Sequence, residues 1–88
     1  MTEENRMNVG IQPLDAILQE KEIKNHDLVA AMPPGFINHK QVQKARKGRR
    51  LTIHMQEKIL EALNVACAPE EYAFKEIFTY RGKKELVD

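Results

Sequence analysis

Basic and hydrogen-bonding side chains are concentrated in residues 38–50, NHKQVQKARKGRR. This stretch holds six of the 14 Lys and Arg residues of the chain and no acidic residue. Gln, Lys and His side chains can hydrogen-bond to base edges, while Lys and Arg pair with phosphate groups. These residue types therefore favour binding to a polyanion, and in a nucleic acid some of them could also hydrogen-bond to the bases. The six basic residues are Lys40, Lys44, Arg46, Lys47, Arg49 and Arg50.

The rest of the chain is acidic. Taking those six residues from the 14 leaves eight Lys and Arg against 13 Asp and Glu. From Asp27 to Glu57 the chain runs through 29 residues without an acid. Such asymmetry makes one side of a molecule attractive to polyanions while the remainder keeps the protein soluble. A solvated helix face is the ordinary explanation of a basic run, but the missing counter-charges argue against it here.

Length and composition indicate one small globular domain. The chain has 88 residues, of which 42% are hydrophobic and 31% charged. No apolar run approaches the roughly 20 residues that a membrane helix needs, and the polar start MTEENRMNVG does not read as a signal peptide. The single cysteine, Cys67, allows no disulfide framework and is expected to be a small apolar residue. We therefore expect a cytoplasmic protein without membrane contact.

No group of residues suggests catalysis or metal binding. His26, His39 and His54 fall on three different predicted helices and have no Cys or carboxylate at ligand spacing. Neither a Ser–His–Asp nor a Cys–His arrangement can be assembled, and there is no Gly-rich phosphate loop. We expect a protein that is not an enzyme and that has no metal, no cofactor and no small-molecule ligand.

The first half of the chain predicts two short helices. Residues 1–12 lack apolar periodicity and are predicted to be a flexible arm. Pro13 suits a first helical position, and apolar residues at i, i+3 and i+4 follow it in a helix ending near Lys21. A second helix should start at Lys24 or Asn25, with Asn25 as the natural N-cap, and should stop before PPG.

The second half predicts three more helices. Asn38 and Gly48 are suitable caps for a helix between them, and Thr52 caps a fourth helix that ends at Asn64. Pro69 starts a fifth helix, rich in aromatic residues. In the helix of 38–47 only Val42 and Ala45 are apolar, and they are three residues apart on one side. The side chains expected to point away from the core are those of His39, Lys40, Gln43, Lys44 and Lys47.

The fold class predicted is therefore all-α, with five short helices. Residues 13–80 form the domain, and residues 81–88 form a charged C-terminal tail. The aromatic residues between Tyr72 and Tyr80 are more typical of a core than of an interface. They nevertheless lie near the end of a small chain, so a dimer contact there stays open.

This arrangement resembles the Cro and phage-repressor type of helix-turn-helix DNA-binding domain, also described as lambda-repressor-like or XRE-like. The resemblance covers about residues 13 to 65. LDAILQEKEIKNHDLVAAM looks like the first two helices of the family, and QEKILEALNV like its fourth. NHKQVQKARKGRRLT is similar to its recognition helix, with Val42 inward and Gly48 closing. The span from Val29 to Val42 is about three residues longer than usual, and PPGF holds the extra length.

The resemblance implies a sequence-specific DNA-binding protein, a small bacterial or phage transcriptional regulator that inserts helix 38–47 into the major groove. It also implies a homodimer on a palindromic site, and the last helix and tail are the candidate dimer surface. The same fold could instead be a protein-interaction module whose basic face binds an acidic partner. Base reading would fall to His39, Lys40 and Lys44, flanked by Gln41 and Gln43. Contacts with the DNA backbone would fall to Lys24, Asn25, Lys47, Arg49 and Arg50.

Overall fold

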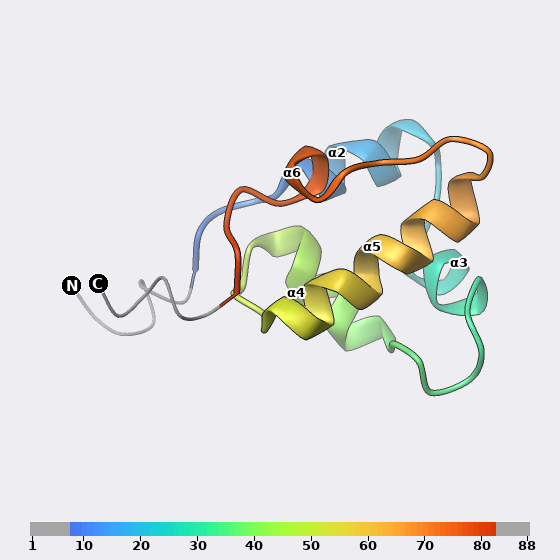
Figure 1. Cartoon of the computed structure of the whole chain (residues 1–88), viewed down its shortest axis with the longest axis horizontal. Coiled ribbons are helices and arrows are strands. Elements are labelled where there is room, and N and C mark those ends of the chain that lie inside the picture. The colour runs from blue at the N-terminus through green and yellow to red at the C-terminus, as the bar shows by residue number, and fades with distance from the viewer. Residues whose placement is uncertain (1–7, 83–88) are drawn as a thin grey trace.

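The computed structural model describes residues 8–82 (Figure 1). Within that range the chain forms five α-helices and no β-strand, which confirms the all-α prediction. The helices are α2 (Pro13–Glu20), α3 (Asn25–Ala30), α4 (His39–Lys47), α5 (Ile53–Cys67) and α6 (Phe74–Ile77).

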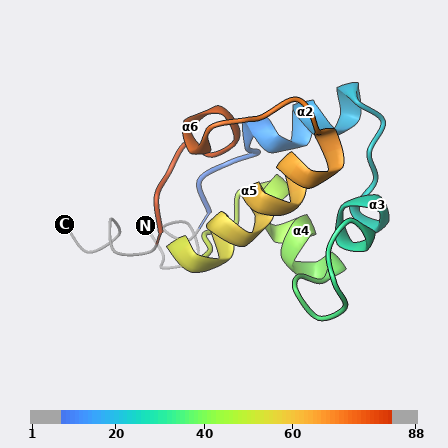
Figure 2. The ribbon, with the colours of Figure 1, turned by 45° about the vertical axis from the view of Figure 1, so that its right-hand side comes forward.

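The longest helix, α5, crosses the middle of the molecule. Both ribbon views place α2 and α6 on one side of α5, and α3 and α4 on the other (Figures 1 and 2). Helix α4 contacts α2, α3 and α5, so it is held from three directions. The apolar side chains that fill the space between these helices include the fully buried Leu14, Leu18, Leu28, Val42, Ile59, Leu63 and Ile77.

Helix α4 begins and ends where its sequence predicts. The Asn38 side chain accepts a hydrogen bond from the Gln41 backbone N–H (2.8 Å), and the Asn38 N–H donates to Gln41 Oε1 (3.0 Å). This reciprocal cap satisfies two backbone donors at the start of the helix. At the other end Gly48 has a φ of 92°, in the left-handed region that glycine adopts without strain. A nine-residue helix is thus delimited by its own caps.

The N-cap prediction for α3 is wrong. Lys24 is the N-cap and Asn25 is the first helical residue. Asp27 takes the capping role instead, since its carboxylate accepts from the Lys24 backbone N–H at 2.9 Å. The Asn25 side chain consequently does not cap α3, and it forms hydrogen bonds with α4 instead.

The predicted boundaries of the last two helices also need correction. Helix α5 continues past Asn64 to Cys67, because the Asn64 side chain bonds with the Tyr72 backbone and does not cap its own helix. Helix α6 starts at Phe74 and not at Pro69. Its first turn forms where Glu76 Oε1 accepts from the Ala73 N–H, at 2.6 Å.

Residues 8–12 belong to the folded body and are not part of a loose arm. Val9 N donates to Gly48 O (2.8 Å) and Gln12 N to Arg46 O (3.0 Å), so the segment runs along the end of α4. The Gln12 side chain is 2% exposed. The segment is held by the hydrogen bonds of the buried Gln12. Its attachment therefore leaves no apolar periodicity in the sequence. Residues 1–7 of the predicted arm lie outside the described residues.

The C-terminal segment is likewise tied to the body as far as Gly82. Gln56, fully buried, donates to Tyr80 O (3.1 Å) and accepts from Gly82 N (2.6 Å). Ile77, Phe78 and Tyr80 are buried within this chain, so these aromatic and apolar residues are part of the core. Of the tail predicted for 81–88, residues 83–88 lie outside the described part of the chain.

Candidate nucleic-acid interface

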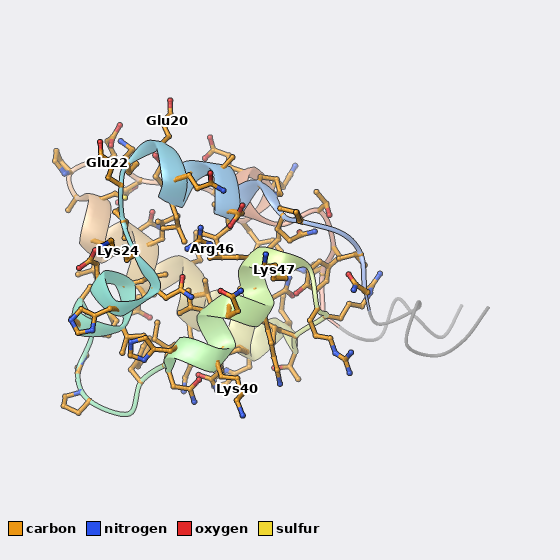
Figure 3. The ribbon with its side chains drawn as sticks, turned by 180° about the vertical axis from the view of Figure 1, so that it is seen from behind. Glu20, Glu22, Lys24, Lys40, Arg46 and Lys47 are labelled. Carbon is orange, nitrogen blue, oxygen red and sulfur yellow. The ribbon has the colours of Figure 1, made fainter. Side chains whose placement is uncertain are left out.

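Helix α4 presents one polar, basic face to solvent. Val42 and Ala45 on its inner side are fully buried, and they are the only apolar residues of the helix. Nine residues at 1.5 Å each make a rod of about 13 Å. Figure 3 shows Lys40 projecting from the edge of this helix and Lys47 near its end. The α4 face, as we call it below, consists of the exposed residues His39, Lys40, Gln43, Lys44 and Lys47.

Arg46 differs from the other basic residues of α4 because it points inward. Its Nε lies 2.6 Å from Asp15 Oδ1, and these two side chains are only 16% and 17% exposed. Its Nη1 donates to Asn25 Oδ1 at 2.7 Å. Arg46 therefore connects α4 to both α2 and α3, and Figure 3 shows it between α4 and α2. The spacing offered a signal for this role: Arg46 lies four residues after Val42, on the inner side of the helix.

Asn25 and Gln43, predicted separately as a backbone contact and a base reader, are in direct contact. Asn25 Nδ2 donates to Gln43 Oε1 at 2.9 Å, which joins the start of α3 to the middle of the α4 face. Together with Asp15 and Arg46 they form a four-residue hydrogen-bonded chain across α2, α3 and α4. No sequence pattern predicts this hydrogen-bonded series, because residues 15, 25 and 46 are brought together only by the packing of three helices.

The predicted base readers are not all on the same surface. His39, Lys40, Gln43 and Lys44 share the α4 face. Gln41 does not, because its amide is occupied in the N-terminal cap of α4. The His39 ring stacks on the His26 ring of α3, with 5.8 Å between the ring centroids and 21° between the ring planes.

The predicted backbone contacts also divide. Lys24 is exposed at the start of α3, and Arg49 is exposed just beyond the end of α4. Arg50 is directed toward the C-terminal segment: its Nη1 donates to Gly82 O at 2.8 Å, and its guanidinium lies 5.0 Å from the centre of the Tyr80 ring. Lys24 and Arg49 are therefore the cations that flank the α4 face, and Lys47 belongs to the face itself.

The α4 face contains no acidic side chain of its own. Residues 28–56, which include all of α4, contain none. Glu20 and Glu22 are exposed around the end of α2, across the molecule from Lys40 (Figure 3). The exposed charges of α4 are therefore all positive, as the distribution of charge along the sequence predicts.

A pocket open to solvent adjoins this region where α2, α3 and the end of α4 meet. Its walls include the apolar side chains of Leu18 and Ile23, and its charged lining is mixed, with Glu22 close to Lys24 and Arg46. The pocket therefore lacks the uniform positive charge of the α4 face.

Other kinds of site have little support in the described residues. No group of three or more His, Cys, Asp or Glu within residues 8–82 could hold a metal ion. Burial raises the pKa of the Cys67 thiol, which keeps it protonated at neutral pH. None of the helices in this range is both long and apolar enough to cross a membrane.

Comparisons with known proteins identify no relative. No protein-family model, curated protein or solved structure matches the chain. A functional assignment accordingly rests on the geometry and charge of the α4 face.

Proposed function

We propose that the protein binds double-stranded DNA by placing α4 in the major groove, and that it acts as a small bacterial or phage transcriptional regulator. The observation that carries this proposal is the α4 face itself. It is a capped helix with a basic, hydrogen-bonding surface, and residues 28–56 supply no acid to neutralise it.

The repulsion within this face favours a polyanionic partner. Lys40, Lys44 and Lys47 are spaced i, i+4 and i+7, and like charges at such spacings destabilise an isolated helix slightly. Phosphate groups on either side of the helix would remove that repulsion. The major groove is about 12 Å wide, which admits an α-helix.

The elements around α4 support a helix-turn-helix mode of binding. Helix α3 packs against α4, and an eight-residue connection joins them. We propose that the bundle is of the lambda-repressor-like type, in which the second helix of the pair reads the groove while the first approaches the backbone. We propose that Lys24, at the start of α3, and Arg49, just beyond the end of α4, contact phosphate groups.

One such domain contacts few base pairs, so we propose a symmetric dimer on a palindromic site. Ile77, Phe78 and Tyr80 are committed to the core. A dimer contact through the C-terminal helix would therefore use the less buried Phe74 of that helix and Tyr72 just before it, together with the tail.

The test is fluorescence anisotropy with mixed-sequence duplex DNA across a range of salt concentrations. Five exposed cations, Lys24, Lys40, Lys44, Lys47 and Arg49, predict a log–log salt slope of about −4.5. Lys40→Ala/Lys44→Ala should weaken binding and reduce the slope by about 2.

The matched control removes the same charge from elsewhere. Lys21→Ala/Lys75→Ala takes two cations from the side of the molecule formed by α2 and α6, and should leave the slope nearly unchanged. Absence of salt-dependent binding by the wild type contradicts the proposal and favours an acidic protein as the partner of this face. Equal losses in both double variants would show that the DNA surface lies elsewhere.

A further inference from the structure

We infer that Asn25 determines which base edge Gln43 reads, by fixing the orientation of the Gln43 amide. This inference rests on the proposed function, since it assumes that the α4 face meets the major groove. It concerns the four hydrogen-bonded residues Asp15, Arg46, Asn25 and Gln43.

The direction of every hydrogen bond among these four side chains follows from the carboxylate of Asp15, which can only accept. Asp15 accepts from Arg46 Nε at 2.6 Å, and a guanidinium can only donate. Its Nη1 must therefore face the oxygen of the Asn25 amide, at 2.7 Å. The Asn25 nitrogen is then left for Gln43, whose oxygen accepts from it at 2.9 Å.

The buried end of the chain makes this orientation stable. The Arg46–Asp15 pair is largely shielded from water, and bonds to an ionised partner are shorter and stronger than neutral ones. Turning the Asn25 amide over would place its N–H groups against the guanidinium. The Arg46–Asp15 ion pair thereby fixes the orientation of the exposed Gln43 amide, through the Asn25 side chain that lies between them.

The consequence is that Gln43 presents donors to the groove. Its Oε1 is engaged by Asn25, and its Nε2 has no partner among residues 8–82. A free glutamine commonly reads adenine with its oxygen and nitrogen together, whereas guanine offers two adjacent acceptors, O6 and N7. Adenine N7 and thymine O4 each accept one bond, so guanine is the base that Gln43 favours, and Asn25 is its positioning residue.

The experiment selects bound duplexes from a random pool with the unsubstituted protein and four variants. Gln43→Ala identifies the base pair concerned, where its guanine preference disappears. At that pair the wild type should favour guanine about two- to tenfold over other bases, which offer Gln43 Nε2 at most one acceptor. Asn25→Asp supplies only acceptors, so it should bind Gln43 Nε2, turn Oε1 outward and shift the preference to cytosine or adenine, which present donors.

Two controls separate orientation from charge and from folding. Asn38→Asp adds the same negative charge at the start of α4 and keeps a good N-cap. It should weaken binding to all sequences alike and leave the guanine preference in place. Gln43→Glu retains an acceptor for Asn25 but removes the outward donors, so it should lose guanine while its thermal unfolding stays close to that of the wild type.

The outcomes distinguish this inference from the proposed function. DNA binding with adenine at the Gln43 position, or Asn25→Asp retaining guanine, overturns the inference alone. Absence of any DNA binding at low salt overturns both. A readout without DNA is also available: in the free protein, the Asn25 side-chain amide NMR signal should shift and exchange faster with solvent in Gln43→Ala. An unchanged signal would show that the two amides do not interact.

Discussion

At the scale of single residues, the role of each cation in residues 38–50 depends on what its side chain reaches. Lys44 and Arg46 are two positions apart, yet Lys44 faces solvent while Arg46 is bound to Asp15 and Asn25. Arg50 contacts Gly82 and Tyr80. Of the six basic residues in 38–50, four are therefore exposed on or beside α4, namely Lys40, Lys44, Lys47 and Arg49.

Tyr80 gives a prediction at this scale. The side chain is 5% exposed, and its hydroxyl accepts from the Leu51 N–H at 3.0 Å. Burial raises the pKa of Tyr80 above the ordinary value of 10.0. The unfolded chain therefore loses its tyrosine proton first as pH rises. The stability that Tyr80 contributes is complete below pH 10 and is lost as the pH rises from there through its raised folded pKa.

Urea unfolding at several pH values between 8 and about 11 measures this effect. Tyr80→Phe should cost about 1–2 kcal/mol at neutral pH, because the Leu51 N–H loses its acceptor, and should flatten the alkaline decline. An equally steep decline in Tyr80→Phe would assign the effect to other groups.

At the scale of elements, α4 can present exposed side chains to a partner because the residues that cap the helix are not those of its exposed face. The Asn38 cap and the left-handed Gly48 hold the helix, while Val42, Ala45 and Arg46 fasten its inner side. Of the α4 face, His39 and Gln43 contact α3, whereas Lys40, Lys44 and Lys47 are exposed. Substitutions of these three lysines should consequently change binding with little effect on folding.

Two glycines provide a matched prediction about these turns. Gly48 and Gly35 both have a positive φ, 92° and 85°, so alanine is strained at either by about 1–2 kcal/mol. A Cβ at Gly48 would also overlap the Gly10 carbonyl, whereas one at Gly35 would meet nothing within 4 Å. Gly48→Ala should therefore lower the free energy of unfolding by about 3 kcal/mol or more.

Thermal and urea unfolding of both variants provide the measurement. Gly35→Ala should show the strain alone, and Gly48→Ala should in addition lose amide-exchange protection at Val9 and Gln12. Similar losses in the two variants would mean that residues 8–12 do not pack against the end of α4.

At the scale of the whole molecule, the first and last segments of the described range, 8–12 and 79–82, are bound to the same body that carries α4. Gln12 Nε2 donates to Thr79 Oγ1 (3.0 Å), and Thr79 N donates to Gln12 Oε1 (2.7 Å), so segments 67 residues apart are joined. Gln12 N also donates to Arg46 O, next to the α4 face. The packing of these two segments is therefore coupled to the end of the helix that we propose to enter DNA.

Gln12→Ala tests this coupling. The substitution removes three side-chain hydrogen-bond partners, Gly10 O, Thr79 Oγ1 and the Thr79 N–H, and should cost about 1–3 kcal/mol. Gln19→Ala, in the neighbouring α2, loses only an exposed bond to Asp15 and should cost a few tenths of a kcal/mol, about 0.2–0.5. Urea denaturation compares them, and equal stabilities would place residues 8–12 outside the cooperative unit.

Local properties of the chain determined the helical class and the ends of α4. Caps such as Asn38 and Gly48 act over a few residues, and the apolar spacing of Val42 and Ala45 identifies the buried side of the helix, so each is readable from neighbours. The charge asymmetry is likewise a property of composition along the chain.

Tertiary structure decided everything that depends on polar contacts across distant segments. The packing of residues 8–12, the inward turn of Arg46 and the Asn25–Gln43 contact involve partners 18 to 67 residues apart. A polar side chain carries no periodic signal of its destination, because its hydrogen-bond partner is set by which helices meet. Apolar burial places the helices, and only then do Asp15, Arg46, Asn25 and Gln43 come within reach of one another.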